Sequence, residues 1–217
     1  MASTELRKLG NRVKSHSDSA KPTPEGSIKN TQDYFRSCQY NEGYWWAELE
    51  SNVTMASEYL LLSHYLGKSD KNRWRKACNY ILSKQSEDGS WGQYYQSPGD
   101  VSTSVEAYLA LKLAGHSPES SPLRKARDFI VASGGVPNTR VFTKIWLALF
   151  GQWDWNGTPN MPPELMLLPS WAPFNIYEFS SWARPTVVPL LLVLTRRPHC
   201  QIPEWAWIDE LYPKGRA

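Results

Sequence analysis

Two glutamates, Glu58 and Glu106, are the acids in this 217-residue sequence whose surroundings most suggest chemistry. Each lies inside an otherwise apolar stretch, "VTMASEYLLLSHYLG" and "VSTSVEAYLALKLAG". An ionised carboxylate in such a place needs partners, because burying it unpaired is costly. Arg140 begins the next apolar segment, and Trp146 follows six residues later. The residues therefore predict an ion pair between Arg140 and a glutamate, and removing one partner would cost roughly 3–5 kcal/mol.

A second pair of acids, Glu87 and Asp88, lies in a Gly-containing turn, "QSEDGSW", and the same register recurs in "QYNEGYW". The side-chain amide can bond backbone groups at helix ends while the indole lies beside it, and each satisfied contact contributes roughly 1 kcal/mol. We therefore interpret the turns as structural connections between helices and the two acids as solvated. The predicted structural residues are Gln39, Gly43, Trp45, Gln85, Gly89 and Trp91.

The cysteines and histidines show no spacing typical of a metal site. The three cysteines form no CxxC pair and the four histidines are scattered, so we expect no metal, no disulfide framework and a cytoplasmic setting. These residues are Cys38, Cys78, Cys200, His16, His64, His116 and His199.

Composition limits the partners further. The net charge of +3 is too small and too scattered to indicate nucleic acid. The N-terminus lacks the apolar region of a signal peptide. The longest apolar run, 187–194, is interrupted by Pro189 and is far shorter than the roughly 20 residues that span a bilayer, which leaves peripheral contact with the inner face of a membrane open. Residues 1–30 contain six basic and no aromatic residues, so we expect a disordered basic lead.

Internal repeats organise the rest of the chain, 31–217. "YFRSCQYNEGYW" aligns without gaps on "YILSKQSEDGSW", and "RKARDFIVASGG" matches "RKACNYILSKQS" with Gly134 in place of the glutamine. The apolar segments between them also correspond, with Glu58 over Glu106 and Gly67 over Gly115. Each unit is thus a helix, a turn to Trp and a second, more apolar helix.

The repeats predict an all-α protein with apolar inner helices inside a ring of outer helices, an α/α barrel. Ser102 and Thr103 followed by Glu106 predict a capping box, Gly115 predicts a helix stop, and Asp100 is a candidate cap. The next inner helices are expected over 140–150 and 183–194. A TPR- or HEAT-like solenoid is the alternative, because the repeat of ~46–49 residues does not decide between them.

A Q-x3-G-x-W turn repeated between apolar helices resembles the QW motif of the triterpene cyclases. From about Thr31 onward, "NEGYWWAELESNVTMASEYLLL", "GDVSTSVEAYLALKLAG", "RVFTKIWLALFGQ", "PPELMLLP" and "FNIYEFSSWARPTVVPLL" are similar to the N-terminal part of squalene–hopene cyclases. The resemblance implies two α-barrel domains around a cavity, and a class II cyclase that protonates an alkene of a linear isoprenoid such as squalene. Aromatic side chains then stabilise the carbocations, and no cofactor is implied.

The resemblance also implies roles for particular residues. Trp182 matches the tryptophan that lines the cyclisation cavity, and Phe179 and Val187 match positions at the constriction of the substrate channel. Glu58, Glu106, Arg140 and Trp146 match a polar, water-containing network beneath the catalytic acid. From the residues alone, a glutamate pairs with Arg140 between stacked repeats without a catalytic role, and Trp182 is one more core indole. For both, the structural interpretation and the one implied by the resemblance stay open.

The catalytic acid of the family belongs to a DxDD motif in the later half of the enzyme, and this sequence contains no DxDD. We therefore expect the chain to be the front segment of a longer cyclase, or one half of a split enzyme that needs a partner chain, and to be inactive alone. The other hypotheses are an isoprenoid-binding or partner-binding scaffold subunit and a non-functional remnant.

Overall fold

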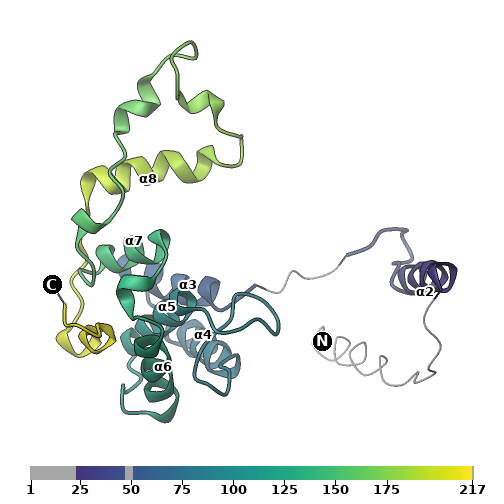
Figure 1. Ribbon diagram of the computed structural model, residues 1–217, viewed down its shortest axis with the longest axis horizontal. Coiled ribbons are helices and arrows are strands. Elements are labelled where there is room, and N and C mark those ends of the chain that lie inside the picture. The colour runs from purple at the N-terminus through teal and green to yellow at the C-terminus, as the bar shows by residue number, and fades with distance from the viewer. Residues whose placement is uncertain (1–22, 47–50, 217) are drawn as a thin grey trace. The chain divides into compact units, whose positions relative to one another are not determined.

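The structure, a computed structural model, describes residues 23–46 and 51–216 (Figure 1). The chain divides into two compact units, 1–49 and 50–217, and each is considered by itself. In the described ranges the only strand-like feature is an isolated bridge between Gly92 and Gly99, so the predicted all-α class is confirmed. None of the helices in these ranges is long and apolar enough to cross a bilayer.

The first unit contains helix α2 (Pro24–Ser37) followed by the Gln39–Trp45 turn. The helix begins where Thr23 accepts a hydrogen bond from the Gly26 amide and Pro24 occupies the first position, which needs no amide donor. Residues 24–30, which we assigned to the disordered lead, are therefore helical because of these start signals. The remainder of that predicted lead, 1–22, lies outside the described residues.

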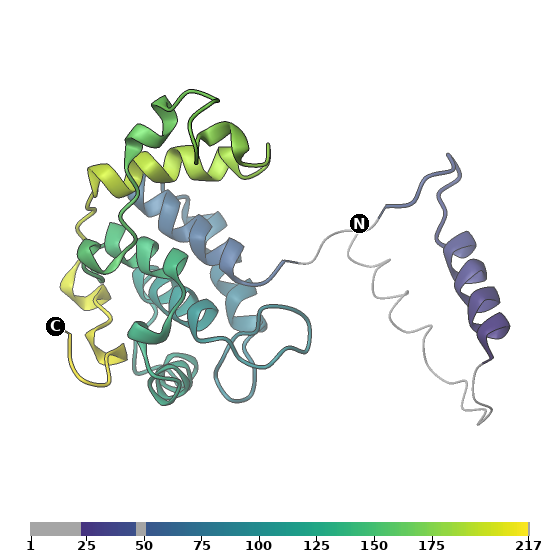
Figure 2. The same ribbon diagram turned by 45° about the horizontal axis from the view of Figure 1, so that its top comes forward.

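The second unit is built around helix α5 (Val101–Leu113), which packs against α3 (Thr54–Tyr65), α6 (Ser121–Ala132) and α7 (Val141–Leu149). Helix α4 (Lys71–Ser83) packs on α3. Figures 1 and 2 show α3 and α5 next to each other, with α4 beside α3 and α6 beside α5. The helix predicted over 183–194 is present as α8 (Arg184–Arg196), within two residues of its expected bounds. It packs mainly on the 3₁₀ segment before it, so its inner position stays a prediction. All residues of α5 from Ser102 to Leu113 are buried.

Helix α5 begins differently from the predicted capping box. Asp100 is the N-cap, and its carboxylate accepts from the Thr103 amide at 2.7 Å. Ser102 instead accepts a hydrogen bond from the Arg140 amide at 2.9 Å, and Glu106 faces a neighbouring helix. The capping box was therefore wrong because both of its side chains are used between helices. The predicted stop is confirmed: Gly115 has a φ of +94° and its amide donates to the Lys112 carbonyl.

The Gln85–Trp91 turn connects three elements of the second unit. The Gln85 amide donates to the carbonyls of Gly89 at 2.8 Å and of Pro122 in the first turn of α6 at 2.9 Å. The buried Trp91 indole donates to the Ile81 carbonyl of α4 at 2.7 Å, and its backbone amide donates to Ser104 of α5 at 3.0 Å. One turn thus links two outer helices and an inner helix.

The same local geometry occurs in the first unit. The Gln39 amide donates to the Gly43 carbonyl at 2.7 Å, and the Trp45 indole donates to the Phe35 carbonyl at 2.7 Å. The two sequences therefore form the same turn, although Trp45 is 53% exposed whereas Trp91 is 1% exposed.

Gly89 is the position in the turn least able to accept a side chain. Its φ is +87°, and an added Cβ would lie 2.4 Å from the backbone carbon of Lys125. We expect Gly89→Ala to lower the free energy of unfolding by about 2 kcal/mol, measured by urea denaturation, because backbone strain and a clash add. The control is Gly115→Ala, which has a similar φ but open space and should lose about 1 kcal/mol. Equal losses would contradict close packing of the turn on α6.

Short 3₁₀ helices dominate the later part of the second unit. They are η2 (Val136–Asn138), η3 (Trp155–Gly157), η4 (Pro163–Leu167), η5 (Ile176–Glu178), η6 (Glu204–Ala206) and η7 (Asp209–Leu211). η4 packs on α8, and η7 packs on α6. The segment that precedes the helix predicted over 183–194 therefore consists mostly of turns and 3₁₀ helices.

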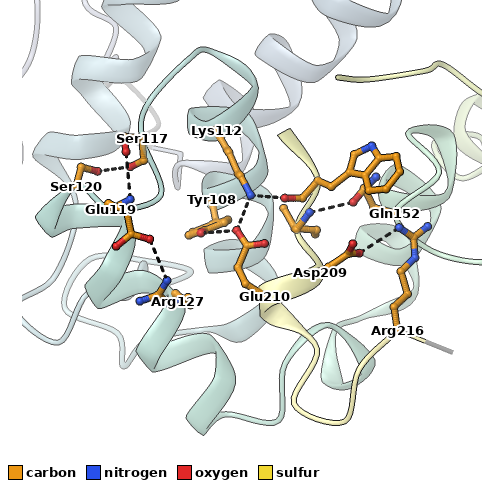
Figure 3. A network of polar contacts seen from close by, with 12 residues as sticks. Tyr108, Lys112, Ser117, Glu119, Ser120, Arg127, Gln152, Asp209, Glu210 and Arg216 are labelled. Carbon is orange, nitrogen blue, oxygen red and sulfur yellow. Dashed lines mark hydrogen bonds and ion pairs between the residues drawn. The ribbon is translucent and has the colours of Figure 1, made fainter. Parts of the chain in front are cut away.

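A partly buried ion pair connects η7 to α5 (Figure 3). The Lys112 ammonium lies 2.5 Å from the Glu210 carboxylate and also donates to the Trp207 carbonyl. The Tyr108 hydroxyl donates to the same carboxylate oxygen at 2.8 Å. The Lys112 side chain is only 6% exposed, so these contacts replace most of its hydration.

Candidate functional site

The two glutamates of the inner helices receive hydrogen bonds from one helix, α7. The Trp146 indole donates to Glu58 of α3 at 2.9 Å, and the Thr143 hydroxyl donates to Glu106 of α5. The Arg140 guanidinium lies 3.6 Å from the same Glu106 oxygen. The structure therefore brings together the four residues that the sequence analysis grouped. We call Glu58, Glu106, Arg140, Thr143 and Trp146 the acid cluster.

Thr143 was missed by the sequence analysis. A signal was available, because Thr143 precedes Trp146 by three residues and so shares its helix face. Arg140 is placed by its own backbone, since its amide donates to Ser102 on α5. The start of α7 is thus tied to the start of α5, which holds the cluster in register.

Burial raises the pKa of Glu106 to about 7. The hydrogen bond from Thr143 and the charge of Arg140 lower the pKa, but the charge of Glu58 raises it further. The Arg140 side chain is 38% exposed and its contact is long, which explains why the guanidinium offsets burial only in part. Burial also raises the pKa of Glu58, against the Trp146 hydrogen bond and the charge of Arg140.

The acid cluster is suited to holding a proton near neutral pH. A carboxyl with a pKa of about 7 is half protonated there and can exchange its proton with a neighbour. The second oxygen of Glu106 is buried and has no hydrogen-bond partner, so the cluster has an unused acceptor. Such a carboxyl holds its proton more tightly than an ordinary glutamate.

The three residues expected at the cavity lie on another segment. Trp182 is 79% exposed and precedes α8, Phe179 follows η5, and Val187 is in the first turns of α8. Phe179 and Val187 are half-buried. The Arg184 guanidinium donates to the Phe179 carbonyl at 3.1 Å, which fixes the backbone between Phe179 and Trp182. The cavity and channel roles of the three residues stay predictions.

Among residues 23–46 and 51–216, no group of three or more His, Cys, Asp or Glu side chains is placed to hold a metal ion. Cys38, Cys78 and Cys200 are free thiols.

Paired helices joined by Gln–Trp turns, with acids on α3 and α5, form the helical framework that the resemblance to the triterpene cyclases implied. Residues 28–217 match the profile of the squalene–hopene cyclase N-terminal domain. The chain is 47% identical over 191 residues to squalene–hopene cyclase of Alicyclobacillus acidocaldarius, covering 88% of this chain and 30% of that protein. It is 44% identical over 195 residues to dammaradiene synthase of Dryopteris crassirhizoma, covering 90% and 28% respectively.

The chain belongs to the squalene–hopene cyclase family, of which it represents the N-terminal domain. This confirms the resemblance stated above and favours the α/α fold of the terpene cyclases over a TPR- or HEAT-like solenoid. A fungal relative, squalene–hopene cyclase of Schizosaccharomyces japonicus, is 40% identical over 87% of this chain and 29% of its own length. The chain therefore spans only 28–30% of the length of these three relatives.

Proposed function

We propose that this chain supplies scaffold and cavity wall to a squalene–hopene-type cyclase and catalyses no cyclisation alone. The observation that carries the proposal is its match to the N-terminal domain, which covers only 30% of the Alicyclobacillus acidocaldarius cyclase. The sequence contains no DxDD, and the pKa of Glu106 is raised by burial rather than lowered. The remaining part of the cyclase, in the same polypeptide or a partner chain, would provide the acid.

Within the complete enzyme, we assign Trp182, Phe179 and Val187 to the surface that the isoprenoid chain contacts. The high exposure of the Trp182 indole leaves its face free to contact a substrate or another part of the cyclase. An aromatic face in a dry cavity attracts a carbocation by about 2 kcal/mol or more. The acid cluster would keep the family's catalytic aspartic acid protonated by exchanging protons with it.

The test is direct incubation of the purified 217-residue chain with squalene, followed by mass spectrometry of the extracted lipids. We expect no cyclic product, because the chain contains no DxDD motif to supply the proton. The complete Alicyclobacillus acidocaldarius cyclase, assayed in the same detergent, is the positive control. Any polycyclic product from the chain alone would refute the proposed inactivity.

A further inference from the structure

Helix α3 carries a stripe of large apolar side chains on its exposed side. Met55, Tyr59, Leu62 and Leu66 are 64%, 38%, 47% and 53% exposed, and their spacing of four, three and four residues places them on one helix face. Ser57, Leu60 and Leu61, on the opposite face, are buried. We call Met55, Tyr59, Leu62 and Leu66 the α3 stripe.

The stripe distinguishes α3 from α5. Helix α5, which aligns with α3 in the repeat, is buried all round from Ser102 to Leu113. The α5 residues that correspond to the stripe are small, namely Thr103, Ala107, Ala110 and Ala114. Large apolar side chains in a row on a helix normally pack on another element, so the described residues of this unit leave the stripe without a packing partner.

The stripe is also unlike the end of a helical array. A terminal repeat that faces water carries a polar outer surface, because an apolar surface would cause association. No acidic or basic side chain belongs to the stripe. The relatives are more than three times as long as the matched region, so their remaining length offers the helices that this face lacks.

We propose that the α3 stripe is the docking surface for an apolar helix of the remaining part of the cyclase. The inference rests on the proposed function, which it extends by naming the contact face. In a ring of helix pairs the first inner helix must meet a later one, and α3 is the first inner helix of its unit. The large side chains of the stripe would fill the space that the small residues of α5 leave to its neighbours.

The binding experiment uses the full 217-residue chain and the part of the Alicyclobacillus acidocaldarius cyclase that follows the matched region, co-expressed and purified. Leu62→Glu should weaken the complex by about 100-fold or more, because a charge would be buried without a partner. The control is Tyr95→Glu, since Tyr95 is 81% exposed in a turn outside the stripe, and its effect should stay below about twofold.

A labelling experiment tests the same surface without a disruptive charge. Leu62→Cys should react quickly with a polar maleimide in the chain alone and at least about tenfold more slowly in the complex, because docking excludes the reagent. Peptide mass spectrometry separates this site from the native cysteines, and Tyr95→Cys should react equally in both samples. Slow labelling of Leu62→Cys in the chain alone would mean that another part of this chain, or a second copy, covers the stripe. This result would overturn the inference.

The outcomes separate the surface from the function. A complex that Leu62→Glu leaves intact, or no complex with the wild-type chain, would overturn the docking surface. A complex that depends on Leu62 but converts no squalene would support the docking surface and refute the proposed function. Circular dichroism of Leu62→Glu should match the wild type, because the side chain is already half exposed.

Discussion

Glu210→Ala is expected to lower the free energy of unfolding by about 3–5 kcal/mol, because it leaves the Lys112 ammonium buried and unpaired. The ammonium lies 2.5 Å from the Glu210 carboxylate, and the Lys112 side chain is 6% exposed. Without the carboxylate, the Trp207 carbonyl would be the remaining acceptor that the structure places on Lys112. Urea denaturation at pH 7, followed by circular dichroism, measures the loss.

The neighbouring acid provides a matched control. Asp209 lies on the same 3₁₀ helix and pairs with Arg216 at 3.3 Å, but its side chain is 51% exposed. Asp209→Ala should therefore cost at most about 1 kcal/mol. Adding Lys112→Met to Glu210→Ala should restore most of the loss, because an apolar side chain needs no partner there. Equal losses in free energy of unfolding for Glu210→Ala and Asp209→Ala would show that burial of Lys112 does not determine the contribution of this ion pair.

Most of the fold could be predicted from the sequence, because internal repeats and the residues that start and stop helices are visible over short stretches of sequence. The inner helices, the stop at Gly115 and the two Gln–Trp turns all follow from residue types at short spacing. The start of α2 was missed although Thr23 and Pro24 are typical helix-start residues. The basic, Ser-containing composition of residues 1–30 led us to predict disorder there instead. The capping box failed because tertiary contacts took Ser102 and Glu106 away from their own helix.

The site was predictable only where the repeat pointed to it. Glu58 and Glu106 occupy equivalent repeat positions, so their joint use by α7 has a sequence signal. Lys112 and Glu210 have none, because 98 residues separate them and nothing in "ALKLAG" shows that its lysine is buried. The roles of Trp182, Phe179 and Val187 come from resemblance, and they stay predictions until substrate contact is measured.

We expect the contribution of Glu106 to the free energy of unfolding to fall as the pH rises. The pKa of Glu106 is raised to about 7 in the folded state from an ordinary value of 4.5, so the folded state binds the proton more tightly. Its contribution is fully present below about pH 4.5 and is lost as the pH rises through about 7. A shift of this size corresponds to about 3 kcal/mol. The difference in free energy of unfolding between Glu106→Gln and the wild type should therefore shift by about 3 kcal/mol in favour of the variant between pH 4 and pH 8.

Denaturation of both proteins at the two pH values measures this change in difference, which removes effects that they share. Glu119→Gln is the control, because it removes an acid that is 73% exposed and pairs with Arg127 at the surface, where a pair contributes at most about 1 kcal/mol. A difference between Glu106→Gln and wild type that is the same at pH 4 and pH 8 would show that Glu106 is not desolvated. It would also remove the physical basis for proton exchange by the acid cluster, because an ordinary glutamate is fully ionised at neutral pH.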